Sequence, residues 1–376
     1  MLFKRLLALT ALTVPIVSAG WEDRETPLVF SIEQDESELL SLEKKLIEIP
    51  SVSKEETLVA DFLKGYLEEK GLTVETIPLD DGTGRYNIYA YQGTTRATKV
   101  LLTAHIDTVP PYIPFYVEGD RIYGRGSNDC KGSIASQLTA LFELQESGAV
   151  KEGDVSVLLV VGEEIGGDGM HKASATLGDL WDTVIFGEPT ENKLAVGHKG
   201  IYMFKVKVTG KAAHSGYPEL GIDANRIMIK LAANLYAADW PISETLGETN
   251  VNIGTFSGGV AGNVVSPYAE FTTVIRNSAD SETIDAIVGN AIGDQEHVDF
   301  ELVQKNDPVY LNYKVPGFDS FIASYSTDVP FLNGNFTRYL YGPGSILVAH
   351  SDHEYVTFDS LKTAVEGYKT LITYSL

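Results

Sequence analysis

Short groups of histidine and acidic residues follow several apolar runs of this chain, and such groups could bind metal ions. The first is His105-Ile106-Asp107, directly after the β-rich run 99–103. Positions two apart in an extended segment face the same way. If His105 binds a metal, Asp107 is therefore expected to stand behind its ring and to fix its tautomer and orientation. Alone, this tripeptide is only a weak indication.

The second group is the glycine-rich segment 124–132, which opens a predicted helix. Three glycines around Asp129 suit a backbone that turns sharply and comes close to a ligand. A carboxylate at this position could bridge two cations. The alternative is that Asp129 or Ser133 simply caps the helix.

The third group places two adjacent carboxylates, Glu163 and Glu164, at the exit of the apolar run 155–161. Such neighbours repel each other unless a positive charge compensates them. One carboxylate acting as a metal ligand and the other as the general base for a water would resolve the repulsion. A solvated loop is the alternative.

Two further groups complete the set, Gly187-Glu188-Pro189-Thr190 and the segment His350 to Glu354. Each follows a short apolar run and could be ordinary when taken alone. Strand exits are where α/β folds bind their ligands. Five such positions in one α/β domain therefore predict one shared site.

The elements that must position these residues alternate between helices and strands. Helices are expected at 39–49, 53–70 and 133–147, with Ser53 and Glu56 forming a capping box for the second. Strands are expected at 73–77, 87–91, 99–103, 155–161 and 183–186. This pattern predicts an α/β domain with a central mixed β-sheet flanked by helices.

The pattern changes near Lys193 to the order β-α-β-β-α-β, which is that of a ferredoxin-like α+β unit. The expected elements are 201–209, 223–238, 249–256, 268–276, 281–292 and 298–303. We predict a catalytic domain at 20–194 and 305–376, with an inserted lid or dimerisation domain at 195–304.

The N-terminus and the charge bear on location and partners. Lys4 and Arg5 precede a short apolar run and Val17-Ser18-Ala19, which predicts a signal peptide at 1–19 and a secreted protein. No later stretch is long and apolar enough for a membrane span. The net charge of −23 disfavours nucleic acid and anionic membranes as partners.

Asn335-Phe336-Thr337 is a glycosylation sequon, used only in a eukaryotic secretory pathway.

Taken together, the motifs resemble the M20 metallopeptidase family, which includes acetylornithine and succinyl-diaminopimelate deacylases, aminoacylases and a glutamate carboxypeptidase. The resemblance runs from about residue 38 to the end of the chain, in the family's order and spacing. It rests on His105-x-Asp107, Gly124-Arg125-Gly126 through Asp129 and Lys131-Gly132, Glu163-Glu164, Gly187-Glu188-Pro189-Thr190 and His350.

This resemblance implies a site with two zinc ions, although cobalt or manganese suits the same ligands. Asp129 would bridge the ions, one also held by His105 and Glu188, the other by Glu164 and His350. Glu163 would be the general base, and Asp107 would hold His105.

Three residues of the inserted domain resemble substrate contacts of the family. His214 would steady the oxyanion, in dimeric relatives from the partner subunit. Arg276 would bind a substrate carboxylate, although the acid that often stands two positions earlier is Val274 here. Asn263 would contact the substrate or the oxyanion.

The predicted activity is therefore hydrolysis of amide bonds in peptides or N-acyl amino acids, most simply as a carboxypeptidase. An aminoacylase or deacetylase and an aminopeptidase stay open as alternatives. A catalytically silent, secreted binding protein is the alternative outside the enzymes. A homodimer through the inserted domain is a further expectation.

Overall fold

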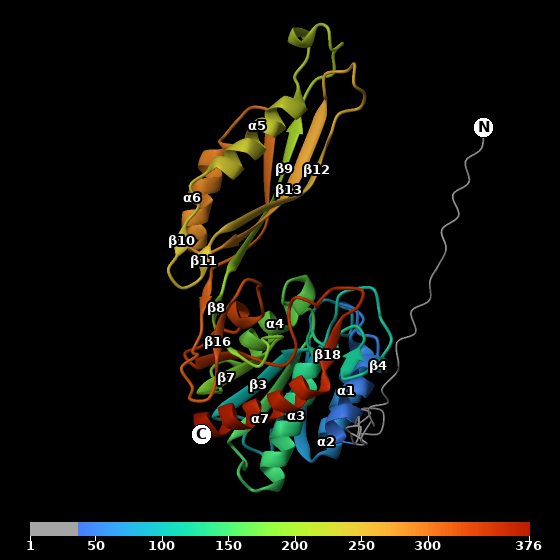
Figure 1. The fold of residues 1–376 in the computed structure, drawn as a ribbon, viewed down its shortest axis with the longest axis vertical. Helices are drawn as coiled ribbons and strands as arrows, with labels where there is room; N and C mark the ends of the chain where they lie inside the picture. The colour runs from blue at the N-terminus through green and yellow to red at the C-terminus, as the bar shows by residue number, and fades with distance from the viewer. Residues whose placement is uncertain (1–36) are drawn as a thin grey trace, which may run out of the picture.

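The computed structural model describes residues 37–376, so the predicted signal peptide at 1–19 lies outside the described part. Two units are stacked along the long axis of the molecule (Figure 1). The lower unit surrounds a six-stranded sheet, and the upper, elongated unit carries a four-stranded sheet. Within residues 37–376, no helix has the length and the apolar composition that crossing a membrane requires.

The central sheet of the lower unit is mixed, as predicted. Its strand order is β1-β2-β6-β3-β7-β17, in which β6, β3, β7 and β17 run parallel while β1 and β2 are antiparallel to their neighbours. The strands are β1 (Leu72–Pro78), β2 (Tyr86–Gln92), β3 (Val100–His105), β6 (Val155–Val160), β7 (Thr183–Gly187) and β17 (Thr337–Tyr341).

Helices cover both faces of this sheet. On one face lie α1 (Glu38–Glu48), α2 (Thr57–Glu69), α3 (Lys131–Glu146) and α7 (Phe358–Ser375), and on the other lies α4 (Asp168–Leu177). Successive side chains of a strand point to opposite faces. Val100 and Leu102 of β3 accordingly join the first hydrophobic core, whereas Leu101 joins the second. Burial on both faces explains why these strands read as continuous apolar runs.

Two small sheets complete the lower unit. One consists of β8 (Leu194–His198), β15 (Val309–Tyr310) and β16 (Ser320–Ala323), next to the upper unit. The other consists of β4 (Tyr116–Glu118), β5 (Arg121–Tyr123) and β18 (Tyr355–Thr357).

The upper unit has the predicted ferredoxin-like order. It contains β9 (Gly200–Thr209), α5 (Ala224–Ala237), β12 (Asn250–Gly258), β13 (Tyr268–Asn277), α6 (Ser281–Ile292) and β14 (Val298–Asn306), with a small hairpin of β10 (Ile242–Ser243) and β11 (Gly247–Glu248). The sheet order is β12-β13-β9-β14. Tyr202, Phe204, Val206 and Val208 of β9 are buried in one core with both helices. The alternate residues of β9, starting at Ile201, therefore lie on the opposite face.

The predicted capping box of the second helix is wrong. Helix α2 begins at Thr57, and its N-cap residue, Glu56, makes no side-chain capping bond. The Ser53 hydroxyl instead donates to Asp107 Oδ2 at 2.8 Å. Both side chains thus serve tertiary contacts, which local sequence spacing does not reveal.

A buried ion pair supports the loop after β6. Arg85 Nη1 lies 3.1 Å from Glu56 Oε1, and both side chains are almost fully buried. The same guanidinium reaches Asp81 at 2.7 Å and Asp168 at 3.4 Å. A Cβ on Gly162, whose φ is 76°, would stand 3.3 Å from Arg85 Nη1. Arg85 therefore backs the turn that leads into Glu163.

Replacing Arg85 with Met should destabilise the protein by roughly 3–5 kcal/mol, because it leaves the Glu56 carboxylate buried without its cation. Urea unfolding measures the change. The double variant Arg85→Met/Glu56→Gln should recover much of the loss. Lys64→Ala, which removes an exposed pair with Glu68, is the control and should cost less than about 1 kcal/mol. Equal losses for Arg85→Met and Lys64→Ala would contradict this view of the pair.

Candidate metal centre and active site

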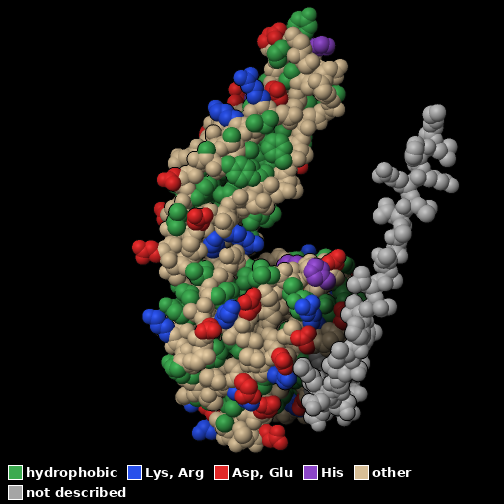
Figure 2. Space-filling view, in the orientation of Figure 1, with side chains coloured by type: hydrophobic (Ala, Val, Ile, Leu, Met, Phe, Trp, Pro, Cys, Tyr) green, Lys and Arg blue, Asp and Glu red, His purple; other side chains and the backbone are tan. Residues whose placement is uncertain are grey.

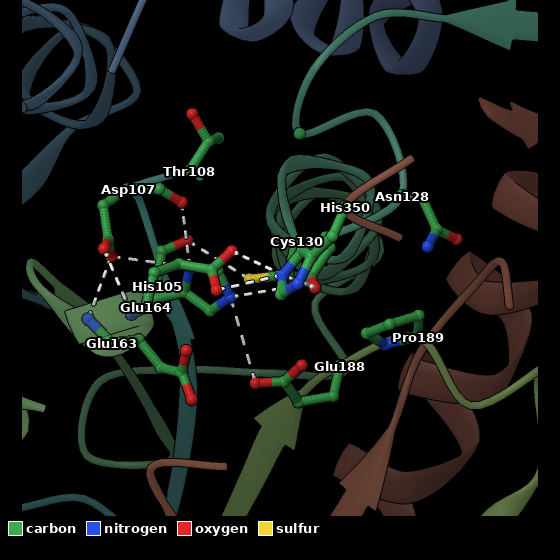
Figure 3. A network of polar contacts seen from close by, with 12 residues as sticks. His105, Asp107, Thr108, Asn128, Cys130, Glu163, Glu164, Glu188, Pro189 and His350 are labelled. Atoms are coloured by element: carbon green, nitrogen blue, oxygen red, sulfur yellow. Dashed lines mark hydrogen bonds and ion pairs between the residues drawn. The ribbon is translucent and has the colours of Figure 1, made fainter. Parts of the chain in front are cut away.

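The five groups predicted from the sequence converge at one edge of the central sheet (Figure 3). His105 is the last residue of β3, Glu163 and Glu164 follow β6, and Glu188 follows β7. These three strands are parallel neighbours, so their carboxyl ends meet. Asp129 lies just before α3, and His350 lies in the segment between β17 and β18.

Asp129 stands between two histidines. Its Oδ1 lies 3.0 Å from His105 Nε2, and its Oδ2 lies 3.3 Å from His350 Nε2. Glu164 Oε2 is 3.0 Å from His350 Nε2, and Glu188 Oε1 is 4.0 Å from His105 Nε2. The side chains thus form two groups that share Asp129, in the arrangement that the family resemblance implies.

Asp107 connects the His105 ring to the loop of the two glutamates. His105 Nδ1 lies 3.0 Å from the Asp107 carbonyl oxygen and 3.5 Å from its Oδ1. The Asp107 carboxylate also accepts the backbone N–H of Glu163 at 3.0 Å and that of Glu164 at 3.2 Å. With the Ser53 hydroxyl as a further donor, this fully buried carboxylate fixes the ring and the loop together.

Glu354 organises the loop that carries Asp129, a contribution that the sequence analysis missed. Its Oε1 accepts the backbone N–H groups of Gly126, Asn128 and Asp129, each at 3.1 Å. Its Oε2 accepts from Arg125 Nη1 at 2.6 Å, and both side chains are buried. The only sequence signal was the position of Glu354 four residues after His350 in an acidic, histidine-rich segment.

The site holds more buried negative charge than its histidines can balance. Burial and neighbouring carboxylates raise the pKa of Glu163 and Glu188 well above the ordinary glutamate value. Burial also opposes ionisation of Asp129, but hydrogen bonds from His105 and His350 hold its pKa below the ordinary value. The same contacts with Asp129 and Glu164 raise the pKa of His350 to about 10. A divalent ion would take the place of the protons that make these two histidines cationic, and the neutral rings could then bind it.

The donor set fits divalent metal ions. Two imidazole nitrogens and three carboxylates, from Asp129, Glu164 and Glu188, surround a common space, and imidazole with carboxylate is a ligand combination of zinc. The Cys130 sulfur is also near His105 and Asp129. Its thiol donates to the His105 carbonyl oxygen at 3.2 Å, and burial raises its pKa. Cys130 is thus a protonated, packed side chain.

A cleft of about 350 Å³ runs from these residues to the upper unit. Asp129, Glu163, Glu164, Glu188 and His350 line its floor, and Ile201, Arg276, Gln304 and Asn306 line it from the upper unit. Arg276 makes no hydrogen bond or ion pair with any residue in the described range 37–376, so its guanidinium is available to a ligand. In the space-filling view, histidine side chains lie on top of the lower unit, facing the upper one (Figure 2).

His214 and Asn263 do not line this cleft. They are exposed neighbours in loops at the far end of the upper sheet, where Ser215 N donates to Asn263 O at 3.0 Å and His214 forms a bridge with Val264. Asn335, the predicted glycosylation site, is exposed just before β17.

Relatives of this chain are fungal proteins that match over most of their length. A peptidase M20 domain-containing protein of Schizosaccharomyces pombe is 48% identical over 340 residues, which cover 90% of this chain and 85% of the relative. A probable carboxypeptidase of Emericella nidulans is 40% identical over an alignment of 418 positions, which covers 98% of each chain.

Solved structures share the fold at lower sequence identity. A tripeptidase of Staphylococcus aureus superposes with a TM-score of 0.76 at 21% identity, over 90% of this chain and 98% of that one. A dinuclear metal-binding peptidase of Bacillus subtilis, from the M20 family, superposes with a TM-score of 0.63 at 16% identity, over 89% of this chain and 97% of that one.

The family model for peptidase family M20/M25/M40 matches residues 101–374. This segment includes all five groups that meet at the edge of the sheet. The chain therefore belongs to peptidase family M20/M25/M40 and is a metallopeptidase.

Proposed function

We propose that this metallopeptidase uses two divalent metal ions, zinc above all, to hydrolyse amide bonds of peptides or N-acyl amino acids. The observation that carries the proposal is the position of Asp129 between His105 and His350. Glu188 and Glu164 complete the two groups of ligands, and cobalt or manganese would suit the same donors. The Bacillus subtilis neighbour, described as a dinuclear metal-binding peptidase, supports the count of two.

Glu163 is the proposed general base, because it lines the cleft beside these ligands without being one of them. Two divalent ions, when bound, would polarise the substrate carbonyl and acidify a water. Glu163 takes a proton from the attacking water while the water oxygen bonds to the carbonyl carbon. It then gives that proton to the leaving amine nitrogen as the C–N bond breaks. Asp107 keeps the His105 ring and the Glu163 loop in place.

A carboxypeptidase-like specificity is favoured over the alternatives. Arg276, which has no ion-pair partner among residues 37–376, lies across the cleft from four carboxylates, and a guanidinium suits a substrate carboxylate. The names of relatives, such as the probable carboxypeptidase of Emericella nidulans, point the same way. An aminoacylase or deacetylase would also use Arg276, whereas an aminopeptidase would not need it.

His214 and Asn263 are proposed to serve the site of a second copy in a homodimer. Within one chain they lie at the end of the upper unit that is distal to the cleft, and both are exposed. A role for them at the oxyanion therefore requires either a large closure of the upper unit or a partner subunit.

We further propose that residues 1–19 direct secretion and are removed, and that Asn335 carries a glycan. The support is the composition of the N-terminal segment and the exposure of Asn335. N-terminal sequencing and the mass of protein recovered from the medium of a eukaryotic host test both. An intact N-terminus or an unmodified Asn335 would contradict them.

Glu163→Gln should lower kcat by about 10²–10⁴-fold because the attacking water loses its base, while the metal content stays at the wild-type value. Glu164→Gln is the matched variant and should lower the metal content as well. A chelator should abolish wild-type hydrolysis, and added zinc should restore it. Retention of most activity in Glu163→Gln would remove the residue from its proposed role.

Arg276→Met should lower kcat/KM for a dipeptide or an N-acyl amino acid with a free carboxylate by roughly 100-fold, since a charge-assisted pair is lost. The C-terminal amide of the same substrate should lose little. Hydrolysis rates of both substrates by both proteins decide the matter. If the wild type cleaves only aminoacyl amides, the protein is an aminopeptidase and Arg276 has another use.

Mixing the inactive variants His214→Ala and Glu163→Gln should restore activity if each site draws His214 from the partner, because mixed dimers then contain one complete site. Sedimentation of the wild type should show a dimer. A monomeric, fully active wild type, or a mixture that stays inactive after exchange, would place His214 outside the reaction.

A further inference from the structure

The base of the upper sheet presents a row of three side chains to the cleft. Ile201 of β9 pairs with Arg276 of β13 on one side and with Asn306 of β14 on the other. Residues directly opposite each other in neighbouring strands project from the same face of a sheet. All three residues line the cleft that the proposed metal ligands also line. The register alone therefore aims Arg276 and Asn306 at the same space.

The Asn306 side chain is a hydrogen-bond donor without a partner. Its Nδ2 atom is shielded from solvent and makes no hydrogen bond within residues 37–376. A shielded donor of this kind is rare unless a ligand or a water satisfies it. The backbone around it is fixed, because the Asn306 carbonyl accepts from Asn277 Nδ2 at 3.3 Å and the residue pairs with Ile201. Asn306 is thus held at the wall of the cleft, with a donor that no group of residues 37–376 uses.

The Tyr325 and Ser326 hydroxyl groups on this side of the cleft are already engaged, whereas Gln304, which also lines it, makes no side-chain hydrogen bond within residues 37–376. The Tyr325 hydroxyl donates to the Pro189 carbonyl oxygen at 3.0 Å, and the Ser326 hydroxyl donates to the Lys199 carbonyl oxygen at 3.5 Å. Arg276 and Asn306, in contrast, have donors to spare. They face a floor that carries Asp129, Glu163, Glu164 and Glu188, so the cleft is polarised, with donors above and carboxylates below.

The spacing of the two donors suits one small anionic group. Neighbouring strands lie about 4.8 Å apart, which separates the Arg276 and Asn306 backbones by roughly 10 Å across β9. Ile201, between them, offers an apolar surface. A carboxylate above Ile201 can accept from the long guanidinium with one oxygen and from the Asn306 amide with the other.

We propose that Asn306 determines substrate specificity by donating a hydrogen bond to the substrate carboxylate that Arg276 also binds. The inference rests on the proposed carboxypeptidase-like function and deepens it, because it assigns a second donor to the carboxylate subsite. Asn306 contacts the substrate away from the scissile amide, so its contribution lies in binding and alignment. The substrate class is a short peptide or N-acyl amino acid that ends in a free carboxylate.

The test compares Asn306→Asp and Asn306→Leu with the wild type on a matched pair of substrates, an N-acyl dipeptide with a free carboxylate and its C-terminal amide. Both variants should lower kcat/KM for the free acid by about ten- to 100-fold, mostly through KM. The amide should change less than about threefold. Asn306→Asp should be the more severe, because it adds a like charge at nearly constant shape. Metal content and melting temperature, measured in parallel, should match the wild type.

The control is Asn252→Leu, which alters an exposed asparagine on the same face of the upper sheet, opposite Val274 and outside the cleft lining. It should leave the preference for the free acid unchanged. If the wild type prefers the free acid and the Asn306 variants keep that preference in full, the inference about Asn306 is wrong while the proposed function stands. If the wild type shows no preference for the free acid, the carboxypeptidase-like function fails, and the inference fails with it.

Discussion

The whole site depends on one buried carboxylate, that of Glu354. It gathers three backbone N–H groups of the segment 126–129 on one oxygen and the Arg125 guanidinium on the other. A carboxylate removed from water is stable only when its lone pairs are satisfied in this way. Because Glu354 lies four residues after His350, the same contact joins the loop of Asp129 to the loop of His350, over more than 200 residues of sequence. The proposed bridging ligand, Asp129, and one of the two histidines beside it, His350, are thereby positioned together.

The sheet supplies the second constraint. Three parallel strands end side by side, so backbone pairing brings His105, Glu163, Glu164 and Glu188 to the same edge of the sheet. The result is a concentration of carboxylates that burial makes unfavourable. Divalent ions bound here would relieve this repulsion, and the hydrogen bonds of Asp107 hold the loop in place. The clustered carboxylates thus lower the stability of the fold locally but create a site suited to cations. Such unfavourable charge clusters are typical of functional sites.

The sequence allowed correct predictions where a reactive residue stands directly next to a recognisable helix or strand pattern. His105, Glu163 and Glu188 end apolar runs, and β9 alternates between buried and half-buried residues, so the strand exits and the upper unit could be predicted. Ser53 and Glu56 were misread because a capping box and a pair of tertiary contacts use the same residues. Glu354 was not assigned because its partners lie far away in sequence. Asn306 could not be found at all, since its place in the cleft follows from the register between strands.

The connection between the two units explains why residues at the base of the upper sheet can serve the cleft of the same chain, whereas residues at its tip cannot. The chain crosses twice, from β8 to β9 through Lys199 and from β14 to β15 through Asp307 and Pro308. The first crossing is pinned, since Lys199 Nζ donates to Asn250 Oδ1 at 2.6 Å and His198 contacts Thr327 Oγ1 at 3.2 Å. Arg276 and Asn306 lie next to these crossings, so any rotation about them displaces the two side chains least. His214 and Asn263 lie at the opposite end and would move most. A substrate carboxylate is therefore best held at the base, whereas groups at the tip are better placed to meet a second copy.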